Sequence, residues 1–227
     1  MKAALAYLCR PMVPRKFMDS LVDLGAYEAT LPPADRVFDQ RILRLQFPPY
    51  PAQGRRQLVR EFLRLLPPDV DRLLMVDDDQ RFDPWQPATL VGLLGPATPV
   101  VSGLYFAYDE DKRAVRPIIL RGDHATGCKT VWRYAAGMVE VDTVGMGFCG
   151  IWRPALEEWR AAHGDTWFDH RARANGDAMI EDAAFCARMQ SLGKKLYVQT
   201  NLRIGHVKLV EVGESDYRPR DLPAANL

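Results

Sequence analysis

The sequence lacks several features that would assign it to a protein class at once. Its 227 residues carry 30 basic and 29 acidic side chains, so there is no basic excess to neutralise nucleic-acid phosphates. General nucleic-acid binding is therefore disfavoured. The sequence contains no internal repeat and no low-complexity block. Together with a hydrophobic content of 48%, this excludes a disordered, collagen-like or coiled-coil chain and predicts a globular protein.

Cysteines are few, and long apolar runs are missing. None of the four cysteines forms a CxxC pair, which argues against a zinc ribbon or a redox motif. The longest early apolar run covers only residues 3–9, too short for a membrane span. No amphipathic basic helix is evident, which argues against membrane docking. From these absences we expect a cytoplasmic protein without a membrane span.

Hydrophobic periodicity predicts alternating strands and helices. Short apolar runs at 3–8, 73–76 and 100–101 indicate strands, and the alternation of apolar and polar residues at 43–47 indicates a half-buried strand. Helical spacing appears at 17–24, where Gly25 is expected to end the helix, and at 55–66 and 90–94. This alternation predicts an α/β fold with an open, mostly parallel sheet.

The second part of the chain follows another pattern. Residues 106–150 hold short β-like runs between glycines, before predicted helices at 154–163 and 180–192 and predicted strands at 196–198 and 202–204. We predict one domain over 1–227. Its halves are a nucleotide-binding part at about 1–105 and an acceptor and catalytic part at about 106–210, followed by an irregular tail at 211–227.

Three adjacent carboxylates, Asp77, Asp78 and Asp79, follow the apolar strand 73–76 directly. Neighbouring carboxylates raise one another's pKa, so this arrangement is costly without a cation. Ligands of parallel α/β sheets bind outside the carboxyl ends of the strands. Divalent cations with bound phosphates prefer such oxygens. The triplet therefore indicates a metal and phosphate site, with a solvated acidic turn or helix cap as the alternative.

Two further positions could carry chemistry. Glu181 and Asp182 open the helix at 180–192, where acidic side chains either stabilise the helix dipole or supply a general base. His206 follows the strand-like run 202–204 and Gly205. A lone histidine is usually structural, but a neutral imidazole also binds manganese-like ions beside carboxylates.

An ordered set of motifs resembles a known family. The motifs are Arg56-Gln57-Leu58-Val59, Leu74–Asp79, Val101–Tyr105, Val141–Gly147, Trp167-Phe168, Glu181-Asp182 with Phe185-Cys186, and Gly205-His206. With them the chain resembles the nucleotide-sugar-dependent glycosyltransferases of the A-type (GT-A) fold, especially bacterial and phage members related to family 2. The resemblance implies a GT-A-like domain with a mixed, mostly parallel sheet flanked by helices and a small β-rich acceptor side.

The resemblance also implies roles for individual residues. Asp77-x-Asp79 would be the DxD motif, with Asp79 and His206 holding a divalent cation, manganese or magnesium. Asp182 would be the catalytic base of the Glu181-Asp182 motif in an inverting reaction. The donor and its nucleotide would contact Arg56, Asp77, Asp78, Asp39 and Gly103. The donor sugar or the acceptor would contact Gly145, Met146, Gly147 and Trp167.

The implied partner is a nucleoside-diphosphate sugar, and the acceptor stays open between a glycan, a lipid, a protein and a modified nucleic-acid base. Two other functions remain as alternatives. A sugar nucleotidyltransferase would share the sheet and the carboxylates, but residues 10–15 contain no glycine to grip a triphosphate. A non-catalytic carbohydrate-binding protein could stack sugars on tryptophans such as Trp132 and Trp167, unless these pack in the core.

Overall fold

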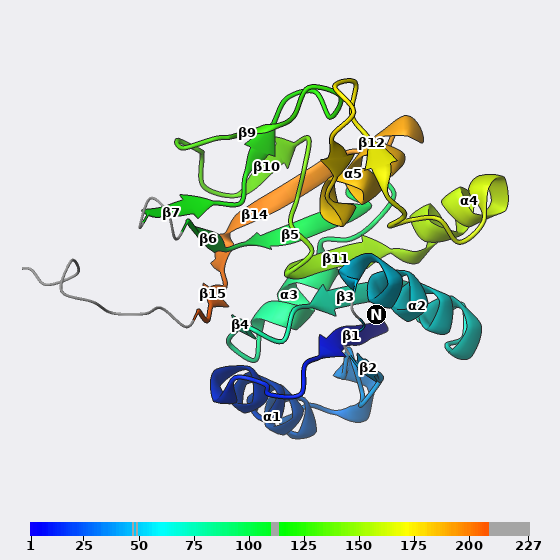
Figure 1. Cartoon of the computed structure of the whole chain (residues 1–227). Helices are drawn as coiled ribbons and strands as arrows, with labels where there is room; N and C mark the ends of the chain where they lie inside the picture. Colours follow the sequence, from blue (N-terminus) through cyan, green and yellow to red (C-terminus); the bar gives the residue numbers. More distant parts are fainter. Residues whose placement is uncertain (47, 49, 110–113, 209–227) are drawn as a thin grey trace, which may run out of the picture.

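A seven-stranded mixed sheet forms the centre of the molecule (Figure 1). The computed structural model describes residues 1–46, 48, 50–109 and 114–208. Five strands run in one direction, while β11 and β10 are antiparallel to their neighbours. This confirms the predicted mixed, mostly parallel α/β sheet. In spatial order the strands are β10 (Met138–Val141), β14 (Leu196–Arg203), β5 (Val100–Leu104), β11 (Phe148–Trp152), β3 (Arg72–Val76), β1 (Ala3–Cys9) and β2 (Ile42–Gln46).

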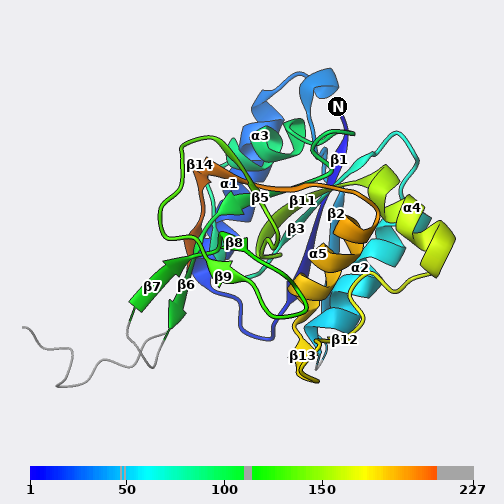
Figure 2. The same cartoon turned by 90° about the horizontal axis from the view of Figure 1, so that it is seen from above.

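Helices cover both faces of this sheet (Figure 2). On one face lie α1 (Arg15–Thr30) and α3 (Gln86–Gly92), and on the other α2 (Pro51–Leu65), α4 (Arg153–His163) and α5 (Glu181–Ser191). Since the central strands are covered on both sides, they are apolar throughout instead of alternating with polar residues. Within the described ranges, no helix combines the length and apolar character needed to cross a bilayer.

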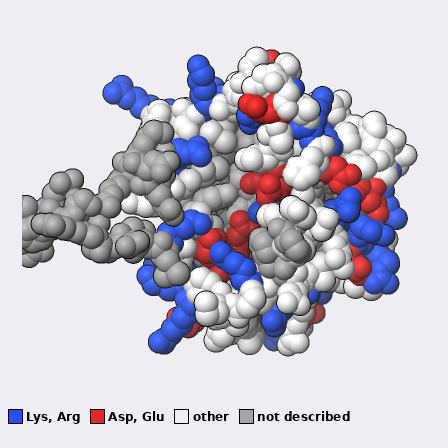
Figure 3. Space-filling view, in the orientation of Figure 1, with Lys and Arg blue, Asp and Glu red and all other residues white. Residues whose placement is uncertain are grey.

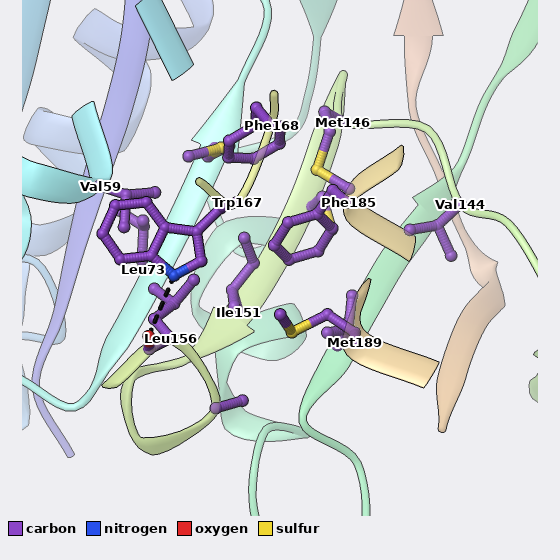
Figure 4. Packing of buried hydrophobic residues seen from close by; sticks show 14 of the residues in the cluster. Val59, Leu73, Val144, Met146, Ile151, Leu156, Trp167, Phe168, Phe185 and Met189 are labelled. Atoms are coloured by element: carbon purple, nitrogen blue, oxygen red, sulfur yellow. Dashed lines mark hydrogen bonds between the residues drawn. The ribbon is translucent and has the colours of Figure 1, made fainter. Parts of the chain in front are cut away.

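The larger hydrophobic core lies between the sheet and the α2, α4 and α5 layer (Figure 4). Phe168 stacks on Phe185 with ring centroids 4.9 Å apart. Trp167 is fully buried beside them, and its indole Nε1 donates a hydrogen bond to the carbonyl of Leu156 over 3.0 Å. Truncating a buried aromatic side chain of this kind costs about 3–5 kcal/mol. Trp167 therefore stabilises the layer on which α5 rests.

Proline and glycine set several helix boundaries. Pro51, Pro87 and Pro154 stand in the first turns of α2, α3 and α4, where no backbone donor is lost. The predicted end of α1 at Gly25 is wrong, because this helix continues to Thr30. A mid-helix glycine costs only about 1 kcal/mol. The helix ends instead where Pro32 disfavours the helical conformation of the residue before it.

Short two-stranded ladders decorate the sheet. They are β4 (Gln80–Arg81) with β15 (Gly205–His206), β6 (Phe106–Asp109) with β7 (Ala114–Pro117), β8 (Leu120–Arg121) with β9 (Lys129–Thr130), and β12 (Arg171–Ala172) with β13 (Ala178–Met179). A short 3-10 turn, Pro33–Asp35, precedes β2. The two strands predicted at 196–198 and 202–204 form one strand, β14. The predicted tail at 211–227 lies outside the described residues.

Candidate functional site

Polar side chains gather where the parallel strands end. Arg10 follows β1, the acidic triplet follows β3, Tyr105 follows β5, and β15 follows β14. The antiparallel strand β11 starts at this same edge, and α5 begins beside it. Figure 3 shows acidic and basic side chains lying side by side in the middle of one face. In open α/β sheets this edge is the usual ligand-binding position.

One group of charges surrounds the end of the acidic triplet, and we call it the Asp79 cluster: Arg10, Asp78, Asp79, His206 and Lys208. Asp79 Oδ2 lies 3.3 Å from His206 Nε2 and 2.9 Å from Lys208 Nζ. Arg10 Nη2 lies 3.3 Å from the same oxygen and 2.5 Å from Asp78 Oδ1. The Arg10 backbone N–H also donates to Asp78 Oδ2 over 2.7 Å. Two carboxylates are thus matched by two permanent cations and an imidazole.

Backbone pairing holds this cluster together. In the β4–β15 ladder His206 pairs with Gln80, and the N–H of Val207 donates to the carbonyl of Asp79 over 2.8 Å. Burial by itself would raise the pKa of Asp79. The hydrogen bonds and charges of His206 and Lys208 outweigh that effect and hold its pKa well below the usual range. Asp79 is therefore an ionised carboxylate at any pH near neutrality.

The Asp79–His206 pair has the chemistry of a divalent-cation site. His206 Nδ1 lies 2.8 Å from the carbonyl of Phe106, which only accepts, so Nδ1 carries the proton. In the neutral ring Nε2 is then a free ligand facing Asp79, oriented by this second hydrogen bond. Among the described residues no group of three His, Cys, Asp or Glu side chains could hold a metal. The pair fits a cation whose remaining ligands are phosphate oxygens and water, the usual environment of Mg²⁺.

A second group, the Arg55 cluster, contains Arg55, Asp77, Glu181 and Asp182. The Arg55 side chain comes from the first turns of α2 and is only 8% exposed. Its Nη2 lies 2.9 Å from Asp77 Oδ1, and its Nη1 contacts Glu181 Oε1 at 3.3 Å and Asp182 Oδ1. The backbone N–H of Met146 donates to the other Asp182 oxygen over 3.0 Å. One buried guanidinium thus serves three carboxylates.

This sharing affects the protonation of Asp182. Burial raises the pKa of Asp182 to about 6, and the carboxylates of Glu181 and Asp77 act in the same direction, against the lowering effect of Arg55. For Arg55, burial would lower the pKa, but Asp182, Asp77 and Glu181 raise it above its ordinary value. Arg55 therefore stays charged, while Asp182 changes protonation closer to neutral pH than an ordinary aspartate does.

The segment before β11 lies against the Arg55 cluster and contacts both Asp77 and Asp182. The carbonyl of Gly147 accepts a hydrogen bond from the N–H of Asp77 over 2.9 Å, and the N–H of Gly147 donates to Tyr105 Oη over 3.2 Å. The N–H of Met146 reaches Asp182, as described above. Gly145 lies against the Tyr105 ring so closely that a Cβ would collide with its hydroxyl oxygen. The predicted contact loop is therefore a closely packed wall between Asp182 and the acidic triplet.

Four of the predicted site residues lie outside both clusters and outside the loop at 145–147. Trp167 belongs to the core described above. Gly103 is buried in β5, where a Cβ would meet Ile204 at 2.8 Å, so this glycine allows close packing beneath the site. Arg56 points to the other flank of α2, where its Nη1 pairs with Asp169 Oδ1 at 2.9 Å.

Asp39 lies away from the site where it was predicted to contact the donor. It precedes β2 and so stands at the opposite edge of the sheet from the strand ends. Its backbone N–H donates to the buried carboxylate of Glu28 over 2.7 Å, and its side chain faces Arg41. The structure does not bring Asp39 to either cluster.

A hollow of about 520 Å³ lies at the sheet edge where the parallel strands end. It is lined by Cys9, Arg10, Pro11, Val13, Arg44 and Gln46, from the ends of β1 and β2. Arg10 is common to this hollow and the Asp79 cluster. A ligand could therefore occupy the hollow and contact Asp78 or Asp79 at the same time.

The site also contains four residues that were not predicted to belong to it: Arg10, Arg55, Tyr105 and Lys208. Arg10 follows the first buried strand just as the acidic triplet follows β3, so its position was a usable signal. Arg55 neighbours the predicted Arg56, but a step of one residue turns a helical side chain by about 100°. Tyr105 ends the motif Val101–Tyr105, but nothing in the local sequence distinguishes Lys208, which the fold brings to the site from beyond β15.

Two solved structures resemble this chain over most of its length. The crystal structure of A197 from STIV matches 92% of this chain and 86% of that chain, with 20% identity and a TM-score of 0.57. The crystal structure of GalNAc-T7 with UDP, GalNAc and Mn²⁺ matches 93% of this chain, with 12% identity and a TM-score of 0.57. The fold is GT-A-like. The match spans only 44% of the GalNAc-T7 chain. No protein-family model and no curated protein matches the sequence.

Proposed function

We propose that the chain is a family-2-like glycosyltransferase that moves a sugar from a nucleoside-diphosphate sugar to an acceptor hydroxyl. The observation that carries this proposal is the meeting of two unlike clusters at one sheet edge. The Asp79 cluster offers cations and metal ligands, whereas the Arg55 cluster offers a buried carboxylate. Asp77 of the Arg55 cluster is next in the chain to Asp78 of the Asp79 cluster, and the loop at 145–147 holds both Asp77 and Asp182. A reaction with an anionic leaving group and a proton to remove needs both environments.

The donor would lie along the Asp79 cluster. Its nucleoside would fill the hollow at the ends of β1 and β2, with Arg10 at the boundary between the hollow and the charges. Arg10 and Lys208 would contact the diphosphate oxygens, exchanging part of their present contact with Asp78 and Asp79 for phosphate. Such charge-assisted contacts stabilise a departing diphosphate when they are already in place before the reaction.

Asp79 and His206 would hold a divalent cation. When bound, manganese or magnesium supplies positive charge that neutralises the leaving diphosphate. The contribution of the chain is to keep the two ligands oriented. The carbonyl of Phe106 holds the imidazole, and the Val207 N–H holds the Asp79 backbone.

Asp182 would act as the general base. Its carboxylate would take the proton of the acceptor hydroxyl while that oxygen bonds to the anomeric carbon and the bond to the diphosphate breaks. Attack from the face opposite the diphosphate would invert the anomeric carbon. With a pKa of about 6, Asp182 is mostly deprotonated at neutral pH and still basic enough to be an efficient acceptor. Arg55 and the Met146 N–H fix its two oxygens in position.

The test is a screen of nucleoside-diphosphate sugars with manganese or magnesium. Release of the nucleoside diphosphate is followed for the wild-type chain and for Asp79→Ala. We expect one donor to be turned over, with turnover lost in Asp79→Ala and in excess chelator. Full turnover in chelator would reject the metal role. Release of pyrophosphate from a nucleoside triphosphate would instead identify a nucleotidyltransferase.

A further inference from the structure

A small hollow of about 180 Å³ lies behind the first turn of α5, and we call it the Arg173 pocket. The residues that matter for its chemistry are Arg116, His124, Cys128, Thr143, Arg173 and Ile180. They come from β7, the loop before β9, the segment before β11, the β12–β13 hairpin and the residue before α5. The N–H of Ala174 donates to the carbonyl of Ala125 over 3.2 Å and ties the hairpin to the loop. This pocket has no part in the chemistry proposed above.

The positive charge of this pocket comes from two arginines on different elements. Arg173 makes no ion pair within the described residues, and its Nε atom is buried without a hydrogen-bond partner. Arg116 reaches Thr130 Oγ1 at 3.3 Å from the opposite wall. A buried guanidinium nitrogen without a partner is costly, and an anion is the ligand that would satisfy it. Arginine pairs with phosphate through two parallel hydrogen bonds, which favours a phosphate group here.

The remaining walls are neutral. His124 Nε2 lies 2.9 Å from Gln190 Oε1, an acceptor, so this nitrogen carries the proton and Nδ1 is free. His124 Nδ1 lies 3.5 Å from the hydroxyl of Thr143, which in turn lies 3.3 Å from Cys128 Sγ. These groups can donate or accept hydrogen bonds without adding charge. Nothing in these walls opposes an anion.

Asp142 and Asp123 each stand next in the chain to a lining residue of the pocket, Thr143 and His124, and both carboxylates accept hydrogen bonds from other groups. Asp142 accepts hydrogen bonds from the N–H of Gly122 at 2.8 Å and from Gln190 Nε2 at 3.2 Å. Asp123 accepts one from the N–H of Ala125 at 2.7 Å. Neither residue lines the pocket. Among the described residues that line the pocket, the two arginines are the only ones with a permanent charge.

The position of the pocket links it to Asp182. Ile180 and Ala183, which line the pocket, stand on either side of the Glu181-Asp182 pair at the start of α5. Thr143 lines it as well and lies three residues before Met146, whose N–H holds Asp182. Ile180 is 58% exposed and forms an open rim. A molecule anchored in the pocket could thus extend past this rim toward the base.

We propose that the Arg173 pocket binds a phosphate group carried by the acceptor. This assignment rests on the proposed function, because it is the acceptor of that reaction that would be anchored. The phosphate would sit between Arg116 and Arg173, while the acceptor hydroxyl reaches Asp182. The acidic Arg55 cluster repels a second negative charge, so the acceptor would bind in this orientation and not in the reverse one.

The direct test is calorimetric titration of the intact chain with phenyl phosphate. We expect Arg173→Gln to weaken binding at least tenfold and Arg173→Lys to weaken it less. Arg171→Gln is the matched control, since Arg171 is an exposed arginine of the same hairpin that does not line the pocket. Thermal unfolding of each variant checks that the fold is retained. Equal affinity in Arg173→Gln and Arg171→Gln, or no binding to the wild type, would overturn the proposal.

Two further titrations identify the source of the phosphate and separate this proposal from the function. Inorganic phosphate should bind no more tightly than phenyl phosphate. Binding of inorganic phosphate with exclusion of phenyl phosphate would assign the pocket to a free anion and overturn the acceptor role. Nucleoside diphosphates should bind wild type and Arg173→Gln equally. If they bind neither, while phenyl phosphate still requires Arg173, the transferase function fails and the phosphate pocket stands.

Discussion

The Asp79 and Arg55 clusters are neighbours at one sheet edge, yet they treat a carboxylate in opposite ways. Asp79 shares one oxygen with Arg10, His206 and Lys208, and its pKa falls well below the usual range. Asp182 competes with two other carboxylates for one guanidinium, and its pKa rises to about 6. Burial acts in the same direction on both, so the difference comes from the charges of the neighbours.

This difference gives each cluster a task. A carboxylate that cannot be protonated is a dependable ligand for cations, whereas one with a raised pKa is suited to accept a proton. In the proposed reaction the sheet edge would thereby separate the site of the leaving anion from the site of the departing proton. A substitution in one cluster therefore leaves the other cluster as its reference.

The largest effect should follow Asp182→Asn. The amide keeps the shape but cannot take a proton, so the transfer rate should fall by about 10²–10⁴-fold. Donor binding, measured by titration with the nucleoside diphosphate, should stay within about twofold, because the Asp79 cluster is untouched. Normal turnover by this variant would show that the base lies elsewhere.

Arg55→Met should be the most destabilising change at the site. It leaves Asp77, Glu181 and Asp182 without their shared cation, and loss of one partner of a buried ion pair costs about 3–5 kcal/mol. The matched control is Arg56→Met, one residue further along α2, where a half-exposed pair with Asp169 contributes about 0–1 kcal/mol. Urea unfolding of both variants measures the difference. Equal loss would mean that Arg55 is not the charge that holds this cluster.

Manganese should stabilise the chain only through the Asp79 cluster. A ligand present at 100 times its dissociation constant adds about 2.7 kcal/mol to the unfolding free energy. We expect the shift in thermal midpoint on adding manganese with a nucleoside diphosphate to disappear in His206→Ala and to persist in Asp182→Asn. A shift that survives His206→Ala would place the cation at other ligands.

A pair of opposite pH slopes is expected in metal-free protein, where each effect is spread over about two pH units. Because the folded pKa of Asp182 is above its ordinary 3.8, the folded state holds an extra proton between about pH 4 and 6. Stability from this group therefore declines as pH rises through that window, by about 1.4 kcal/mol per unit of pKa difference. Asp182→Asn should gain stability relative to wild type over the same range.

Asp79 should give the reverse slope. Its folded pKa lies below the ordinary value, so its stabilising effect is complete above about pH 4 and is lost as pH falls toward the lower folded value. The loss of stability caused by Asp79→Asn, relative to wild type, should therefore grow as the pH rises from about 2 to about 4. Urea unfolding at a series of pH values measures both slopes, and slopes of the same sign would refute the contrast between the clusters.

The fold and half of the site follow from local sequence, and the other half does not. Asp77–Asp79 and Asp182 could be predicted because they stand directly at the end of an apolar strand and the start of a helix. The strand β11 also has a clear apolar pattern, but its antiparallel insertion between β3 and β5 depends on pairing with partners distant in sequence. Local periodicity contains no information about such pairing.

The charges that tune the acids depend on that pairing too. Lys208 reaches Asp79 only because β15 pairs with β4, and Arg55 reaches Asp182 only because α2 and α5 lie on the same sheet face. Arg56 was predicted in place of Arg55 because a motif fixes a position along the chain but not the direction of a side chain around the helix. The sequence likewise did not reveal that Trp167 is buried in the layer that supports the site.

The tight contact between Gly145 and Tyr105 restricts how these two positions can change in evolution. A methyl group at position 145 would overlap the tyrosine hydroxyl and crowd the ring carbon that bears it, so neither residue is free to vary alone. Distant homologues should therefore change these two positions together, with a smaller residue at 105 wherever 145 has gained a side chain. Such paired replacement would be a record of selection on the shape of this wall.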